Sequence, residues 1–183
     1  MKIMNFEKFH SQLDLPFLET EEQFLKEIFE TLEFKFGLKR NSNQKLIDLG
    51  AGNGSIIIFS ALSYGIKSYG VEIDHILVKE AKQHIESLKE SRILKKRQFT
   101  NIKIKLGDFY QQNLKKFDFI YIYTLPSMHK YLNHVLLTAK KGTILISHKY
   151  KLKNFNSYLK YEHWLAHEKD TQKVFTYFYR KFL

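Results

Sequence analysis

The residues with the clearest chemical potential form the segment Asp48-Leu49-Gly50-Ala51-Gly52-Asn53-Gly54, which lies between two apolar runs. Glycines in such a segment permit a tight turn from a strand into a helix and let a ligand approach the backbone closely. The spacing differs from the dinucleotide pattern G-x-G-x-x-G, because Ser55 stands where the third glycine would be. No Gly-Lys-Ser/Thr follows, so the segment is not a P-loop.

Three carboxylates accompany these glycines. Asp48 would repel a pyrophosphate, but it would attract the ammonium and sulfonium groups of S-adenosylmethionine. Glu72 follows some two dozen residues later, where an acidic side chain can accept hydrogen bonds from both ribose hydroxyls. Asp108 could accept from an adenine amino group, with Ile73 and Phe109 on either side of the ring. Each carboxylate alone could be a helix cap or a solvated turn residue; together with the glycines they favour S-adenosylmethionine as the cofactor.

Alternating apolar patterns predict the elements that would hold these residues. Strands are expected at 45–49, 67–73, 102–106, 117–123 and 143–147, and helices from a Thr20/Gln23 capping box to Gly37 and at 55–64, 75–91 and 128–139. Strands that alternate with helices predict a parallel sheet covered on both faces, whose carboxyl edge binds ligands. Two β-prone runs, 161–167 and 173–180, predict a C-terminal antiparallel hairpin.

The predicted fold class is therefore α/β: a Rossmann-like, mostly parallel sheet with an N-terminal helix and a C-terminal hairpin. This layout resembles that of the class I, or seven-strand, methyltransferases. We expect one domain over residues 1–183, with an N-terminal cap (1–40), a cofactor-binding core (45–150) and a C-terminal part (151–183).

Composition narrows the classes of function. The chain of 183 residues has a formal charge of +11 and no cysteine, which excludes disulfides, thiolate metal sites and a cysteine nucleophile. No signal peptide or membrane span is expected, so the prediction is a cytoplasmic protein. Its eight histidines do not suggest a metal site. The positive charge, densest at 89–97, leaves nucleic acid open as a partner; the alternative interpretation is that the excess lysines only solvate the surface.

The residues after the predicted fourth strand bear on the methyl acceptor. Enzymes that methylate exocyclic amines of bases, or a glutamine amide, place Asn or Asp before two prolines and an aromatic residue at this position. The chain instead has Tyr121-Ile122-Tyr123-Thr124-Leu125-Pro126-Ser127-Met128. An apolar, aromatic wall suits a lysine amine, which must lose its proton before it attacks, because burial disfavours the charged form. Tyr123 and Pro126 are the residues expected to line this acceptor channel.

Three segments resemble a small family of protein lysine methyltransferases, which includes a broad-specificity archaeal enzyme and mitochondrial enzymes acting on the adenine nucleotide translocase and the ATP synthase c subunit. These segments are Pro16-Phe17-Leu18-Glu19-Thr20, the glycine segment, and the run from Tyr121 to Met128. The resemblance implies that Phe17 and Thr20 close over the cofactor. It also implies that Asp48, Gly50, Gly52, Asn53 and Gly54 hold the methionine portion. The chain departs from the family pattern at Glu19 (proline), Asn53 (commonly Asp) and Ser55 (often Arg).

The sequence thus predicts a monomeric S-adenosylmethionine-dependent methyltransferase acting on a protein lysine. Two alternatives remain at this point. One is an RNA or small-molecule methyltransferase, motivated by the positive charge. The other is a non-catalytic subunit that keeps the cofactor fold and serves as an assembly partner.

Overall fold

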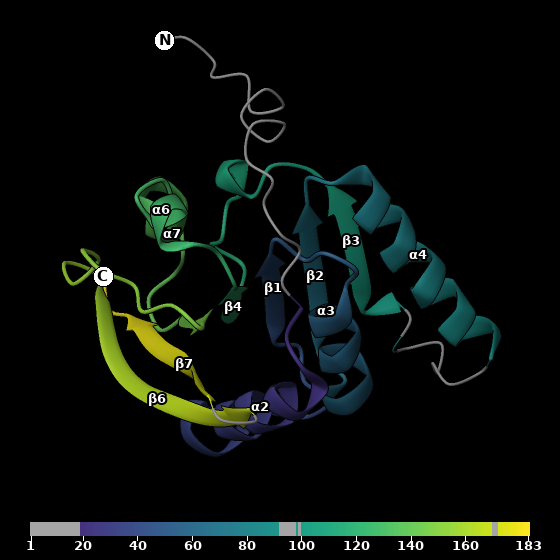
Figure 1. Cartoon of the computed structure of the whole chain (residues 1–183), viewed down its shortest axis with the longest axis horizontal. Helices are drawn as coiled ribbons and strands as arrows, with labels where there is room; N and C mark the ends of the chain where they lie inside the picture. The colour runs from purple at the N-terminus through teal and green to yellow at the C-terminus, as the bar shows by residue number, and fades with distance from the viewer. Residues whose placement is uncertain (1–18, 92–97, 99, 170–171) are drawn as a thin grey trace, which may run out of the picture.

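The computed structural model describes residues 19–91, 98, 100–169 and 172–183. Seven strands form one sheet in the order β3-β2-β1-β4-β5-β7-β6. The parallel strands are β1 (Lys45–Leu49), β2 (Lys67–Glu72), β3 (Ile102–Leu106), β4 (Phe119–Ile122) and β5 (Ile144–His148). The last two, β6 (Leu159–Lys169) and β7 (Gln172–Lys181), form a long antiparallel hairpin, and β7 pairs with β5 (Figure 1). The predicted α/β fold with its C-terminal hairpin is confirmed.

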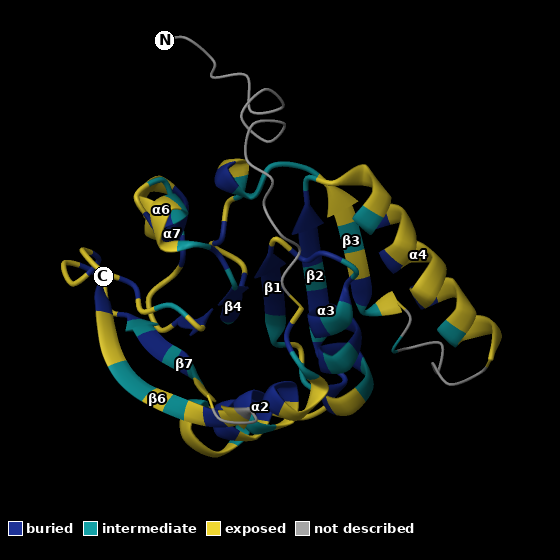
Figure 2. Cartoon of the chain, viewed as in Figure 1, coloured by how far each residue is buried: buried dark blue, intermediate teal, exposed yellow. Residues whose placement is uncertain are grey.

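Helices cover the sheet unequally on its two faces. One face carries α2 (Glu22–Phe36), α3 (Ser55–Phe59), the π-helical turn η1 (Ser60–Tyr64) and α4 (His75–Glu90). The other face is covered mainly by α6 (Pro126–His129), α7 (Asn133–Leu137) and the chain before β6 (Figure 1). The connection from β3 to β4 contains only one 3-10 turn, η2 (Phe109–Gln111), so no full helix covers β2 and β3 on that side. The central strands β1, β4 and β5 are the most deeply buried (Figure 2).

Apolar side chains that alternate along the strands divide into two buried clusters. Leu46, Phe119, Tyr121, Ile146 and Phe178 pack beneath α2 and α3, whereas their neighbours in the sequence pack beneath α6 and α7. This division follows from the period of two in a strand, which sends successive side chains to opposite faces. Both faces are buried, as expected for a parallel sheet.

Several expected boundaries were wrong. Thr20 and Gln23 form no capping box, because α2 begins at Glu22 and the Thr20 hydroxyl lies 2.8 Å from the hydroxyl of Tyr121 instead. The helix expected at 55–64 widens into a π-helical turn after Phe59, and the one expected at 128–139 is two short helices. In each case a long-range contact or a local bend sets the helix boundary, whereas the expected boundary came from the spacing of residues alone.

Gly70 in β2 provides a test of the packing between the glycine loop and the sheet. A Cβ atom at this position would lie 2.7 Å from the Cβ of Ala51 and 3.1 Å from a methyl of Ile57. We expect Gly70→Ala to lower the free energy of unfolding by roughly 1–3 kcal/mol, because overpacking a rigid core forces the backbone to shift. Gly107→Ala is the matched control, since its Cβ would meet nothing closer than 3.8 Å. Equal denaturation midpoints for the two variants in urea titrations would contradict this account.

Candidate functional site

The three carboxylates predicted from the sequence lie at one edge of the sheet. Asp48 is the fourth residue of β1, Glu72 is the last residue of β2, and Asp108 is the second residue after β3. Since β1, β2 and β3 are parallel neighbours, their carboxyl ends meet at the same edge (Figure 1). The tertiary structure therefore brings these carboxylates to the ligand-binding edge of an open α/β sheet.

The glycine loop is fixed to the end of β2 by its backbone. The amides of Gly50 and Ala51 both donate to the carbonyl of Val71, at 2.9 and 3.0 Å. Gly50 has φ +93° and Gly54 has φ +83°, which are left-handed conformations that favour glycine. A Cβ on Gly50 would meet only the ring of Phe109, at 3.9 Å, so the loop surface is open on that side. Phe109 and the loop thus face the same space.

Glu72 has a structural role that the sequence did not reveal. One carboxylate oxygen accepts from the amide of Gly52 at 2.9 Å, and the other accepts from the amides of Ile73 and Asp74 at 2.7 and 2.9 Å. The side chain is nearly buried. Glu72 therefore holds the glycine loop against the end of β2, and any ribose hydroxyls would have to use its remaining lone pairs.

Asp108 is bound mainly by its own turn. Its carboxylate accepts from the amide of Tyr110 at 2.7 Å and from the Gln111 side chain at 3.3 Å, so it caps η2. The ring of Phe109 packs on that of Tyr110, with 4.4 Å between centroids. Asp108, Phe109 and Ile73 are all partly exposed, which leaves them accessible at the edge where an adenine ring is expected.

Asp48 is the most deeply buried of the three carboxylates, with an exposed fraction of 2%. It lines a narrow cavity of about 20 Å³ together with Thr20, Gly50, Tyr121 and Tyr123. Burial, and then repulsion by Glu72, raises the pKa of Asp48 well above its usual value. A cation bound in this cavity would offset both effects, so the site is suited to a positively charged ligand.

The chain before α2 covers this cavity through specific contacts. Thr20 is hydrogen-bonded to Tyr121 across 101 positions of sequence. The amide nitrogen of the Asn53 side chain donates to a Glu19 oxygen at 2.9 Å, and its oxygen accepts from the Ser55 amide at 3.1 Å. Glu19, Asn53 and Ser55 all depart from the family pattern, and Asn53 is hydrogen-bonded to both of the others. Phe17 lies outside the described residues.

The two expected acceptor residues separate in the structure. Tyr123 lines the Asp48 cavity, whereas Pro126 is the first residue of α6 and lines a neighbouring cleft. The hydroxyl of Thr124 between them is buried without a partner in the described part of the chain. The backbone carbonyl of Thr124 contacts Nε2 of His129 at 3.1 Å, which ties α6 to the end of β4.

A buried polar network behind Tyr123 was not predicted. Nδ1 of His148 and Nε2 of His167 each lie 2.8 Å from the hydroxyl of Thr176, and His167 also contacts Glu27 of α2 at 2.5 Å. The His148 ring packs at right angles to that of Tyr123, with 4.8 Å between centroids. Burial lowers the pKa of His148 to about 3, so this ring stays neutral beside the cavity. Only the hairpin brings these residues together, so no local pattern could have signalled the network.

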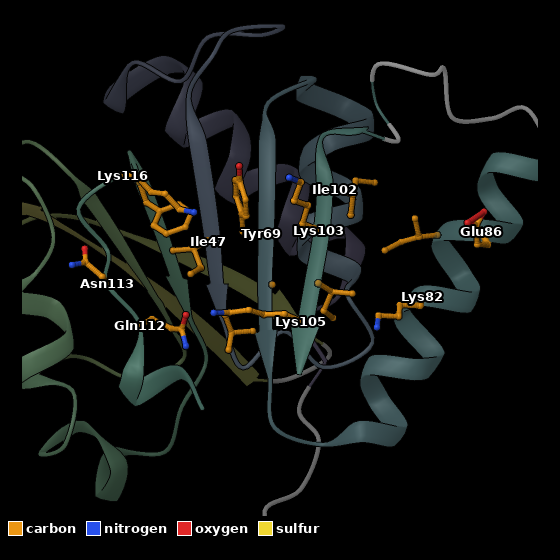
Figure 3. A pocket seen from close by; sticks show the side chains of 15 residues that line it. Ile47, Tyr69, Lys82, Glu86, Ile102, Lys103, Lys105, Gln112, Asn113 and Lys116 are labelled. Atoms are coloured by element: carbon orange, nitrogen blue, oxygen red, sulfur yellow. The ribbon is translucent and has the colours of Figure 1, made fainter. Parts of the chain in front are cut away.

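A larger depression, of about 810 Å³, lies mainly on the opposite face of the sheet and is lined by Ile47, Tyr69, Lys103, Lys105 and Lys116 (Figure 3). Ile47 precedes Asp48 in β1, so the two side chains point to opposite faces. The amine of Lys116 lies 4.7 Å from the centre of the Tyr69 ring. Despite its size, this groove is cationic and lacks the glycine loop, so it is not suited to a sulfonium ligand. We refer to it below as the β3 groove.

Comparisons with known proteins agree with the geometry. A family model described as the ANTKMT methyltransferase domain matches residues 48–158, more than half of the chain. A protein-lysine N-methyltransferase of Saccharolobus islandicus is 25% identical over 144 residues, which are 78% of this chain and 81% of that protein.

Solved structures resemble this one in fold. An RNA methyltransferase from Salinibacter ruber, crystallised with S-adenosylhomocysteine, has a TM-score of 0.70 at 21% identity and covers 90% of this chain and 94% of its own. A tRNA methyltransferase of B. subtilis has a TM-score of 0.65 at 13% identity, covering 90% of this chain and 67% of its own. Among the described residues, no helix has the length and apolar character to cross a membrane, and no three acidic or histidine side chains are placed to hold a metal ion.

The contact between Glu19 and Asn53 provides a test of how the cavity is covered. We expect Asn53→Asp to weaken cofactor binding by roughly threefold to tenfold, because the new carboxylate would face Glu19 and lose the donated hydrogen bond. The double variant Glu19→Gln/Asn53→Asp should recover most of the loss, since a glutamine amide can donate to the aspartate. Calorimetric titration measures both affinities. An additive double variant would show that the two side chains do not interact.

Proposed function

Because the chain belongs to the ANTKMT methyltransferase domain family and is thus a methyltransferase, we propose that it transfers the methyl group of S-adenosylmethionine to the amine of a protein lysine. The observation that carries this proposal is the buried carboxylate of Asp48, which lies between the glycine loop and two tyrosines. That arrangement suits a cationic donor on one side and an alkyl amine on the other. The name of the Saccharolobus relative supports the same acceptor.

The residues present fit the cofactor. The open surface of Gly50 admits a ligand against the backbone, and Asp48 supplies a negative charge beside it. Asp48, Gly50, Gly52, Asn53 and Gly54 would hold the methionine portion, Glu72 the ribose, and Asp108, Ile73 and Phe109 the adenine. Thr20, held by Tyr121, would close over the ligand, as would Phe17. When bound, S-adenosylmethionine supplies an electrophilic methyl carbon on a sulfonium.

The chain's own residues would act on the acceptor by position and polarity. Tyr121 and Tyr123 line the cavity with aromatic rings, and an ammonium that loses its water on entering such a site gives up its proton more readily than one in water. The neutral ring of His148 supports Tyr123 from behind without adding a charge that would repel the lysine. Holding the amine in line with the methyl carbon supplies most of the expected acceleration, and no metal is needed for it.

An RNA acceptor is the second candidate function. The charge of +11 and the lysines of the β3 groove favour it, and so does the likeness in fold to RNA methyltransferases. Against it, the chain has Thr124-Leu125-Pro126 after β4, where enzymes that methylate the exocyclic amine of a base place Asn or Asp before two prolines. We therefore favour the lysine.

Asp48 makes cofactor binding depend on pH. Its pKa is raised in the free protein, so part of the population is protonated where an ordinary aspartate would not be. A bound cation favours the charged form, so binding should release protons and become tighter as pH rises through that raised pKa. Asp48→Asn should abolish this proton release and cost at least about 2 kcal/mol, roughly 30-fold in affinity. Titration calorimetry in two buffers with different ionisation enthalpies measures both. Proton release that is unchanged in the variant would contradict the role of Asp48.

The acceptor can be identified by isotope transfer. We expect the purified protein and tritiated S-adenosylmethionine to label a native lysate at lysine, so that the label survives nuclease and is lost to protease. Asp48→Asn, incubated in parallel, should label nothing above background. Label that is lost to nuclease would establish the RNA alternative. Cofactor binding without any transfer would indicate a non-catalytic subunit.

A further inference from the structure

A second cleft, of about 600 Å³, lies beside the acceptor side of the Asp48 cavity. Pro126, His129 and Lys130 of the α6 region form one wall, and the segment from Lys149 to Phe155 forms the other. The rings of Tyr150, in this cleft, and Tyr123, in the cavity, have centroids 6.4 Å apart. A chain lying in the cleft would therefore pass next to the point at which a lysine enters the cavity. We refer to it as the α6 cleft.

The α6 cleft concentrates positive charge. Lys130, Lys149, Lys151 and Lys153 line it, and no carboxylate of the described residues does. In the described part of the chain, none of the four forms an ion pair; three instead lie over tyrosine rings, with amine-to-centroid distances of 4.6 to 5.7 Å. Like charges held together repel one another, so a cluster of this kind is stabilised by an anionic partner.

The wall formed by residues 149–155 has an unusual backbone. Lys149 has φ +66°, a left-handed conformation that costs energy for a lysine, and Asn154 has φ +68°, which asparagine adopts more readily. Two hydrogen bonds hold the start of this segment: the Lys149 amide donates to the carbonyl of Phe175 at 2.6 Å, and the Ser147 hydroxyl donates to that of Tyr150 at 2.6 Å. The strained turn thus fixes the position of Lys149 at the junction of the cleft and the acceptor site.

We propose that the α6 cleft binds an acidic segment of the protein substrate, so that the enzyme selects lysines flanked by Asp or Glu. The proposal rests on the proposed function, because it assigns a substrate class to that acceptor site. Acidic side chains complement the lysines of the cleft, and the cavity lined by Tyr121 and Tyr123 beside it is the place proposed above for the lysine amine. A phosphate backbone would meet the same lysines, but the residues after β4, Thr124-Leu125-Pro126, lack the Asn or Asp that would hold the amine of a base.

The test compares two synthetic peptides of equal length, each with one lysine, flanked by Glu in one peptide and by Gln in the other. For the wild-type protein at low salt we expect kcat/KM to be about tenfold higher for the Glu peptide, mostly through KM, with the preference declining as salt rises. Lys151→Glu/Lys153→Glu should remove or invert this preference. Lys103→Glu/Lys105→Glu, in the β3 groove, changes the net charge equally and should leave it intact.

Binding is measured separately, by fluorescence anisotropy of both peptides with S-adenosylhomocysteine present. This measurement separates the methylation of lysine from the binding of an acidic segment. A preference for the Glu peptide that depends on Lys151 and Lys153 supports binding in the α6 cleft even if no peptide is methylated. Melting temperatures within a few degrees of wild type show that the variants are folded. Equal affinity of wild type for the two peptides, or an equal loss of preference in both double variants, overturns the proposal. So does an RNA oligonucleotide that binds with this lysine dependence when the Glu peptide does not.

Discussion

The arrangement of the site depends on keeping the carboxylate of Asp48 out of water. Burial beside Glu72 disfavours the charged form of Asp48. The free protein tolerates the two neighbouring carboxylates because the oxygens of Glu72 accept hydrogen bonds from three backbone amides of the glycine loop and the turn after β2. The two acidic residues thus do different things. Glu72 holds the loop in shape, and the buried carboxylate of Asp48 is stabilised when a positive charge binds beside it. A pocket of this kind recognises a sulfonium and an ammonium by charge, and the proposed cofactor carries both.

The segment before α2 helps to enclose the carboxylate of Asp48. Thr20 is fixed by Tyr121, a residue of the central strand β4, and Glu19 is fixed by Asn53 of the glycine loop. The proline and the aspartate that the family pattern has at positions 19 and 53 could not form the hydrogen bond that joins Glu19 to Asn53. In this chain the two side chains pair with each other, so the departure at position 19 is matched by the one at position 53. Differences from a family pattern at contacting positions therefore need not indicate a lost cofactor site.

Charge is distributed unequally between the interior and the surface. The Asp48 cavity is acidic, whereas the α6 cleft and the β3 groove are rich in lysine, within a chain whose net charge is +11. A cationic cofactor is attracted by the pocket, and an anionic partner is attracted by the exterior. The position of the α6 cleft beside Tyr123 distinguishes it from the β3 groove, which lies mainly across the sheet.

The sequence by itself determined the fold class, the order of strands along the chain and the carboxyl-edge position of Asp48, Glu72 and Asp108. Alternating apolar patterns and a glycine loop are local signals, because the spacing of neighbouring residues encodes strands, helices and tight turns directly. What Glu72 binds, the pairing of Glu19 with Asn53, the network of His148, and the separation of Tyr123 from Pro126 were decided only by the tertiary structure. Most of these features depend on residues that are far apart in the sequence and meet only in the fold. The raised pKa of Asp48 likewise follows from burial and from the nearness of Glu72, which the spacing of residues does not express.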